Sequence, residues 1–144
     1  MHQLAPLIHT ALPHLSFEVR AVIDAMLLTR GSVGTAQWVA SHLGLSNRFR
    51  LARRLSSEGL PPLHRLSGWI TVLSWIWEWE RNGVALCRSA LRAGKDPAAC
   101  RRLVRRITGL SWRNVQSGGI ERTLTQFLCE CGAAEGSVRS RAMA

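Results

Sequence analysis

Residues 90–110 read ALRAGKDPAACRRLVRRITGL, and residues 40–60 read ASHLGLSNRFRLARRLSSEGL. Shifted by 50 residues, the two stretches carry equivalent residue types at five landmarks. A small residue suits the crossing of two helices, a glycine allows a left-handed turn, a capping residue starts the next helix, and a second glycine ends it. The pattern therefore predicts two helix-turn-helix units. The paired landmarks are Ala40 with Ala90, Gly44 with Gly94, Ser46 with Asp96, Gly59 with Gly109, and Leu60 with Leu110.

The first unit and the helix before it follow helical spacing. Residues 17–28 carry apolar side chains on one face, behind the capping residue Ser16. A second helix is expected from Thr35 to the first turn glycine, and a third after Ser46. The residues expected on the buried face of that third helix are Phe49, Ala52 and Leu55.

The second unit has equally clear boundaries. A helix over residues 85–93 precedes its turn, and Asp96 followed by Pro97 opens the next helix with an N-cap and a proline at the first position. That helix is expected to end at Gly109, and a last one to cover residues 120–131. No stretch alternates apolar and polar residues as a strand would, so an all-α fold is predicted.

A Trp-rich stretch, residues 63–83, lies between the units. It is apolar around nearly its whole circumference, which is typical of a helix buried on several sides. We expect it to be a long central helix that joins a first lobe, residues 16–62, to a second lobe, residues 84–131. Residues 1–15 are expected to form an N-terminal extension, and residues 132–144 a flexible tail.

Charge sets this chain apart from an ordinary globular protein. Its 144 residues include 19 Lys and Arg, all but Lys95 being arginine, against nine acids, for a formal net charge of +10. Such a balance predicts an anionic partner, and arginine favours nucleic acid because its planar fork binds phosphate or the guanine edge at two points. The Arg codons of a GC-rich genome are the alternative explanation.

Other classes of protein lack support in the sequence. The N-terminus is not that of a signal peptide, and the most apolar stretch, residues 66–79, is too short to cross a membrane, so a cytoplasmic protein is expected. No phosphate loop, nucleophile motif or metal-binding His spacing occurs, so we predict no enzyme, no cofactor and no metal. The cysteines are expected to be free thiols: Cys87, Cys100, Cys129 and Cys131.

Residues 96–112, DPAACRRLVRRITGLSW, resemble the end of the DNA-binding domain of AraC/XylS-type transcription regulators. The usual form of that segment is D-x-x-x-F-x-R-x-F-[KR]-[KR]-x-x-G-[LMV]-[ST]-P. Residues 39–61 resemble the other half of the domain, and the similarity covers roughly residues 17–130. The matching residues of the signature are Asp96, Arg102, Arg105, Arg106, Thr108, Gly109, Leu110 and Ser111.

This chain departs from the family pattern at several positions. The Gly-aromatic pair before the aspartate is one residue short, and Trp112 replaces the final proline. Cys100 and Val104 replace larger aromatic residues. In the first unit, Leu51, Arg53 and Leu55 sit one step later than in the family. Base contacts therefore do not carry over residue by residue.

The resemblance implies a domain of about seven helices in which two helix-turn-helix lobes are joined by a rigid helix. Each lobe would insert its second helix into the major groove, with the two insertions on the order of 34 Å apart on one face of the DNA. A monomer then reads a two-part site. The length leaves no room for the sensor domain of many such regulators, so we expect a stand-alone reader or an effector domain on a partner.

The candidate base readers and phosphate contacts lie on the second helix of each unit. In the first unit, Asn47 suits a bidentate pair with adenine, and arginines suit guanine or phosphate. Arg53 lies near the edge of the buried face, where a salt bridge is the alternative to DNA contact. The candidates of the first unit are Ser46, Asn47, Arg48, Arg50, Arg53 and Arg54.

In the second unit, seven basic residues and one acid lie between Arg92 and Arg113. The small Ala98 and Ala99 allow close approach to DNA or contact with a thymine methyl. The family resemblance gives Arg102 a structural or phosphate-binding role, and a solvated basic face is the alternative for the whole helix. The candidates are Lys95, Ala98, Ala99, Arg101, Arg102, Arg105 and Arg106.

Sequence-specific binding of double-stranded DNA by a transcription regulator is the leading functional hypothesis. An architectural protein that binds all duplexes alike is the first alternative. A helical interaction module that docks a partner such as RNA polymerase, through the Trp-rich helix or the tail, is the second. The Trp-rich cluster also suits single-strand stacking, but its helical spacing favours a buried role.

Overall fold

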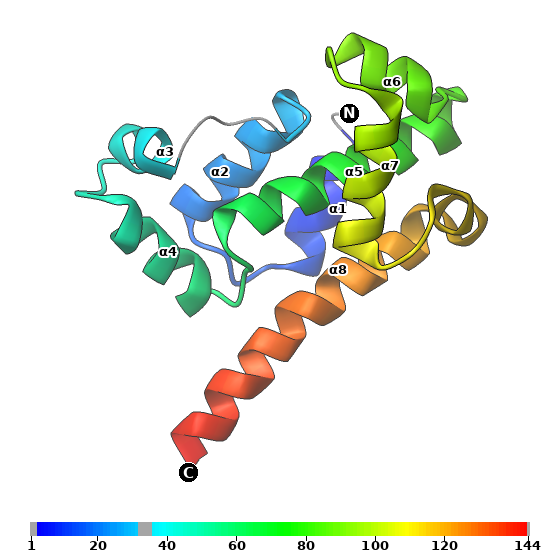
Figure 1. Cartoon of the computed structure of the whole chain (residues 1–144). Coiled ribbons are helices and arrows are strands. Elements are labelled where there is room, and N and C mark those ends of the chain that lie inside the picture. The colour runs from blue at the N-terminus through cyan, green and yellow to red at the C-terminus, as the bar shows by residue number, and fades with distance from the viewer. Residues whose placement is uncertain (1–2, 32–35, 144) are drawn as a thin grey trace.

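The computed structural model of the chain describes residues 3–31 and 36–143 (Figure 1). Within those ranges it consists of eight helices joined by turns, without strands, which confirms the predicted all-α class. Thr35, the expected start of one helix, lies outside the described residues. The helices are α1 (Leu4–Ala11), α2 (Phe17–Leu28), α3 (Ala36–His42), α4 (Arg48–Ser57), α5 (Leu63–Asn82), α6 (Leu86–Arg92), α7 (Pro97–Thr108) and α8 (Trp112–Met143).

The central element is α5, against which α2, α6, α7 and α8 pack (Figure 1). Every residue from Gly68 to Glu78 is buried. The prediction of a Trp-rich helix buried on several sides is therefore confirmed. Buried apolar side chains of all eight helices form one continuous cluster, so the expected lobes share a single core. None of the helices in the described ranges combines the length and apolarity needed to span a bilayer.

The repeat seen in the sequence is also a repeat in the backbone. Gly44 and Gly94 both adopt left-handed conformations, with φ of 73° and 65°. The nitrogen that follows each glycine donates a hydrogen bond to the carbonyl of the repeat alanine, Ala40 or Ala90, at 2.9 Å and 2.8 Å respectively. Both alanines are fully buried, and α3 packs on α4 as α6 packs on α7. We call α3–α4 the first unit and α6–α7 the second unit.

The caps of the two second helices differ from the predicted register. Asp96 caps α7 as expected. The cap of α4, however, is Asn47 and not Ser46, because the Asn47 amide oxygen accepts hydrogen bonds from the backbone nitrogens of Phe49 and Arg50, both at 3.0 Å. The first unit thus begins its second helix one residue later than the repeat predicts.

The buried face of α4 also differs from the prediction. Leu51 and Leu55 are buried, whereas Phe49 is 61% exposed and Ala52 is exposed. Phe49 lies two residues before Leu51, so at helical spacing the two side chains point to opposite sides. The expectation that Phe49 and Ala52 face the core is wrong, and only Leu55 of the three named residues does so.

Both ends of the chain contain helix. Residues 1–15, expected to be an extension, contain α1, whose Leu4 and Ile8 are fully buried against the common core. The tail expected after Cys131 continues as helix to the end of α8, which extends beyond the other helices in Figure 1.

A glycine interrupts α8 near its start. Gly119 has a φ of 74° and non-helical geometry, and the backbone nitrogen of Ile120 donates to the carboxylate of Glu80 on α5 at 2.9 Å. A carboxylate at the start of a helix satisfies a free N–H and favours the positive end of the helix dipole. Glu80 therefore fixes where the second part of α8 begins.

Candidate nucleic-acid interface

The exposed face of α7 is a row of arginines. Its opposite face is formed by Cys100, Val104, Ile107 and Thr108, which are all buried. Helical spacing then turns the four arginines between them to solvent, and none forms an ion pair with a described residue. We call this set the α7 arginine face; it consists of Arg101, Arg102, Arg105 and Arg106.

The start of α7 adds small residues and one more cation. Lys95 is exposed in the turn before the helix, and Ala98 and Ala99 are half-buried. The Asp96 carboxylate accepts a hydrogen bond from the Ala98 nitrogen, so the one acid of this region caps the start of α7. All seven residues predicted for the second unit thus retain accessible surface on one helix or in its leading turn.

In the first unit, α4 presents three exposed arginines. The guanidinium of Arg48 lies 5.0 Å from the centre of the Phe49 ring, a cation–π arrangement, and Arg50 donates to the exposed Ser46 hydroxyl at 3.5 Å. Arg53 is exposed and has no ion pair among the described residues. Arg48, Arg50 and Arg53 therefore remain available to an anionic partner.

Arg54 is held within the protein instead. Its Nη2 lies 2.9 Å from the Glu18 carboxylate on α2, and its Nε donates to Glu58 at 3.1 Å. Glu58 also accepts a hydrogen bond from the Ser16 hydroxyl at 2.8 Å. The salt bridge considered for Arg53 thus belongs to its neighbour, and Arg54 ties the end of α4 to the start of α2.

The cap geometry restricts what Asn47 can do. A bidentate pair with adenine uses the amide oxygen as acceptor and the amide nitrogen as donor. In this structure that oxygen already accepts from two backbone nitrogens, at 3.0 Å each. Asn47 is therefore placed to hold the helix start and has only its amide nitrogen to offer a ligand.

Phe49 and Ala52 belong to this surface although they were expected in the core. Together with Arg53 they lie on the solvent side of α4. The signal that could have revealed them is the i, i+4 spacing of Leu51 and Leu55, which places this pair on one face of the helix and leaves Phe49 on the other. An open hollow of about 390 Å³ borders this side, lined by Leu45, Arg50, Arg53, Arg54 and Ser57.

The cysteines of this region give no sign of reactive chemistry. Burial raises the pKa of the Cys100 thiol, against a smaller opposite effect of Lys95, so the thiol stays protonated and unreactive. Cys87, Cys100 and Cys129 are free thiols, and the described residues contain no group of three or more His, Cys, Asp or Glu side chains suited to a metal ion.

No protein-family model, curated protein or solved structure matches this chain. In Figure 1 the two units lie on either side of α5. The second helix of each unit carries exposed arginines.

Proposed function

We propose that this chain is a transcription regulator that binds double-stranded DNA, with α4 and α7 each entering a major groove. The observation that carries the proposal is the α7 arginine face, four guanidinium groups with no acidic partner in the described part of the chain. Concentrating four like charges on fewer than two turns of helix is unfavourable in the free protein, and a row of phosphates relieves that repulsion.

The central helix supports a two-part mode of binding. The proposal gives α5, which is buried from Gly68 to Glu78, the role of holding the two units apart. For both second helices to enter neighbouring grooves, their separation would be about one helical turn of DNA, on the order of 34 Å. The monomer then suffices to contact both half-sites.

In this proposal the two units make different kinds of contact with DNA. The α7 arginine face, dense in charge, contacts phosphates and fixes the register of the protein on the duplex. On α4, Phe49 and Ala52 offer apolar contacts to thymine methyl groups, and Arg53 beside them offers a bidentate contact to guanine. Sequence preference is therefore expected mainly from α4.

Fluorescence anisotropy with labelled duplexes at several salt concentrations tests the proposal. Affinity should fall as a steep power of the salt concentration, because each phosphate contact releases counterions. Absence of binding to any duplex at about 50 mM salt would refute it. Selection from random duplexes separates a regulator from an architectural protein: enrichment of two half-sites about ten base pairs apart supports the regulator, and an unenriched pool supports the architectural alternative.

A second candidate function, docking of a protein partner such as RNA polymerase, is favoured by one observation. Large apolar side chains are exposed on the first half of the chain: Phe17 is 84%, Leu28 72% and Trp38 53% exposed. Exposed side chains of this size are suited to contact an apolar surface of a partner. Replacement of Phe17 and Leu28 by serine, followed by transcription assays at unchanged DNA affinity, tests this role. Unchanged transcription would remove the support for it.

A further inference from the structure

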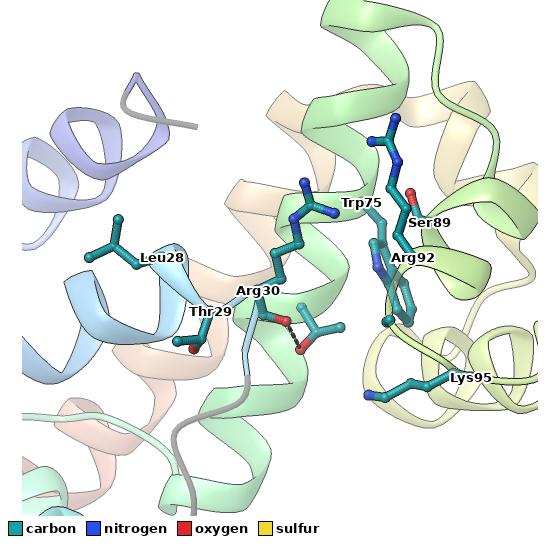
Figure 2. Close-up of a pocket in the computed structure, with 9 residues that line it drawn as sticks. Leu28, Thr29, Arg30, Trp75, Ser89, Arg92 and Lys95 are labelled. Atoms are coloured by element: carbon teal, nitrogen blue, oxygen red, sulfur yellow. Dashed lines mark hydrogen bonds between the residues drawn. The ribbon is translucent and has the colours of Figure 1, made fainter.

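A cavity of about 410 Å³ opens between the end of α2, the middle of α5 and the α6–α7 turn (Figure 2). Its inner wall includes Trp75, together with the hydroxyl residues Thr71 and Ser89. These three residues are at least 95% buried, so the wall is part of the packed core rather than a loop surface. None of the three belongs to a motif that the sequence reveals.

Three cations surround this cavity: Arg30 from the end of α2, Arg92 from α6, and Lys95 from the turn (Figure 2). Arg30 is paired with the buried carboxylate of Glu78, at 3.1 Å, and so contributes little net charge. Arg92 and Lys95 are exposed and form no ion pair with any described residue. The cavity therefore keeps two unneutralised positive charges beside an aromatic wall.

The size of the cavity indicates what would fill it. Sites for small molecules measure about 300–1,000 Å³, so this one lies near the lower end of the range. Inorganic phosphate would satisfy the cations but leave the wall at Trp75 uncovered. A neutral aromatic molecule would cover the wall but leave the cations unpaired.

We propose that the cavity binds a small organic anion, a phosphate monoester or carboxylate with an apolar body. Arg92 and Lys95 reach opposite sides of Trp75 in Figure 2, so the anionic group lies against one of these two cations while the apolar body covers Trp75. Such a ligand contacts α2, α5 and α6 together. That it would also adjust the spacing of the two units on DNA rests on the proposed function, whereas binding itself does not.

Calorimetric titration of the full chain in the absence of DNA tests this proposal with three probes. Phenyl phosphate carries both the ring and the charge, phenol carries the ring alone, and inorganic phosphate carries the charge alone. We expect phenyl phosphate to bind at one site per chain, at least about tenfold more tightly than either of the other probes. Chemical-shift mapping should place the changes at the amides of Thr29, Ser89 and Ala93, which line the cavity.

A charge-matched pair of variants provides the control. Arg92→Gln with Lys95→Gln removes the two unpaired cations, and Arg88→Gln with Arg113→Gln removes two exposed arginines that do not line the cavity. All four side chains are exposed, so both variants should fold, which circular dichroism checks. Phenyl phosphate should bind the first variant at least about tenfold more weakly and the second unchanged.

Three results would overturn the proposal. The first is phenyl phosphate binding no better than inorganic phosphate. The second is an equal loss of affinity in both variants, which would indicate general electrostatics. The third is that no probe binds the wild type while the first variant loses duplex binding. Arg92 and Lys95 would then contact DNA phosphates rather than a small anion.

The cavity proposal and the DNA proposal fail separately. Because the titrations contain no DNA, a negative result in them leaves the DNA proposal standing. A chain that binds no duplex leaves the cavity proposal testable with the same three probes.

Discussion

The guanidinium of Arg65 on α5 lies 2.6 Å from the carboxylate of Glu130 on α8, measured from Nη2 to Oε1. The same carboxylate accepts a hydrogen bond from the indole nitrogen of Trp69 at 2.7 Å. Burial opposes the ionisation of Glu130, but the hydrogen bonds from Arg65 and Trp69 outweigh it and hold the pKa of the carboxyl below its usual value. The hydrogen bond to Glu130 in turn raises the pKa of Arg65.

Replacement of Glu130 by Gln should lower the free energy of unfolding by about 1 to 2 kcal/mol near neutral pH. The value is modest because both side chains of the ion pair are partly exposed. A depressed folded-state pKa stabilises the protein above the usual pKa of glutamate, and that stability is lost as pH falls through the lower folded value. The difference between wild type and E130Q, measured by urea unfolding, should therefore shrink in acid. A difference that grows below about pH 4 would contradict this assignment.

Replacement of Gly31 by Ala should destabilise the fold by about 2 kcal/mol or more. A Cβ atom at this position would lie 1.8 Å from Thr71 Oγ1 and 2.9 Å from the carbonyl oxygen of Ser67, and φ is +99°. Gly94→Ala is the matched control, because its φ is also positive but nothing lies within 4 Å of the added atom. Thermal unfolding should show the larger loss for Gly31. An equal loss of stability in the two variants would mean that α2 and α5 move apart to admit the new Cβ atom at no cost in free energy.

Replacement of Phe49 by Ala should leave stability within about 0.5 kcal/mol, because the ring is exposed. Leu51→Ala, two residues away but buried, should cost about 2 to 5 kcal/mol. If α4 reads bases as proposed, F49A should also weaken binding to the selected duplex more than to a random one. Unfolding curves and anisotropy give the two readouts. A strong loss of stability in F49A would place the ring back in the core.

Neutralisation of the α7 arginine face should reduce the salt dependence of DNA binding. In the double variant Arg102→Gln with Arg106→Gln, the slope of log affinity against log salt should fall by about one for each phosphate that the variant no longer binds. Arg88→Gln with Arg122→Gln, at two exposed arginines outside α7, is the control for the same change in net charge. A slope that stays unchanged in the double variant would show that these arginines do not bind phosphate.

The features that follow from local backbone chemistry could be predicted from the sequence. The left-handed glycines at 44 and 94, the Asp96 cap and the burial of the Trp-rich helix all depend on residues within a few positions of one another. The same holds for the exposure of the α7 arginine face, since its buried side repeats at helical spacing.

Features that depend on choices between near-equal neighbours, or on distant partners, could not be predicted in this way. Ser46 and Asn47 are both capping residues, and either could start α4. Phe49 and Leu51 are both large apolar residues, and the structure buries Leu51 with Leu55 and leaves Phe49 exposed. The ion pair between Arg54 and Glu18 joins residues far apart in the chain, so no local pattern indicates it.

The middle of α5 is covered from several sides at once by α2, α6, α7 and α8. A fragment that stopped after the second unit would lack α8, whose Phe127 and Glu130 contact Trp69, and it should aggregate rather than fold because Trp69 would face water. A chimaera that replaces one half of this protein with part of another DNA-binding protein will therefore also need new residues packed against the tryptophans of α5. In evolution, too, the two halves are bound to change together.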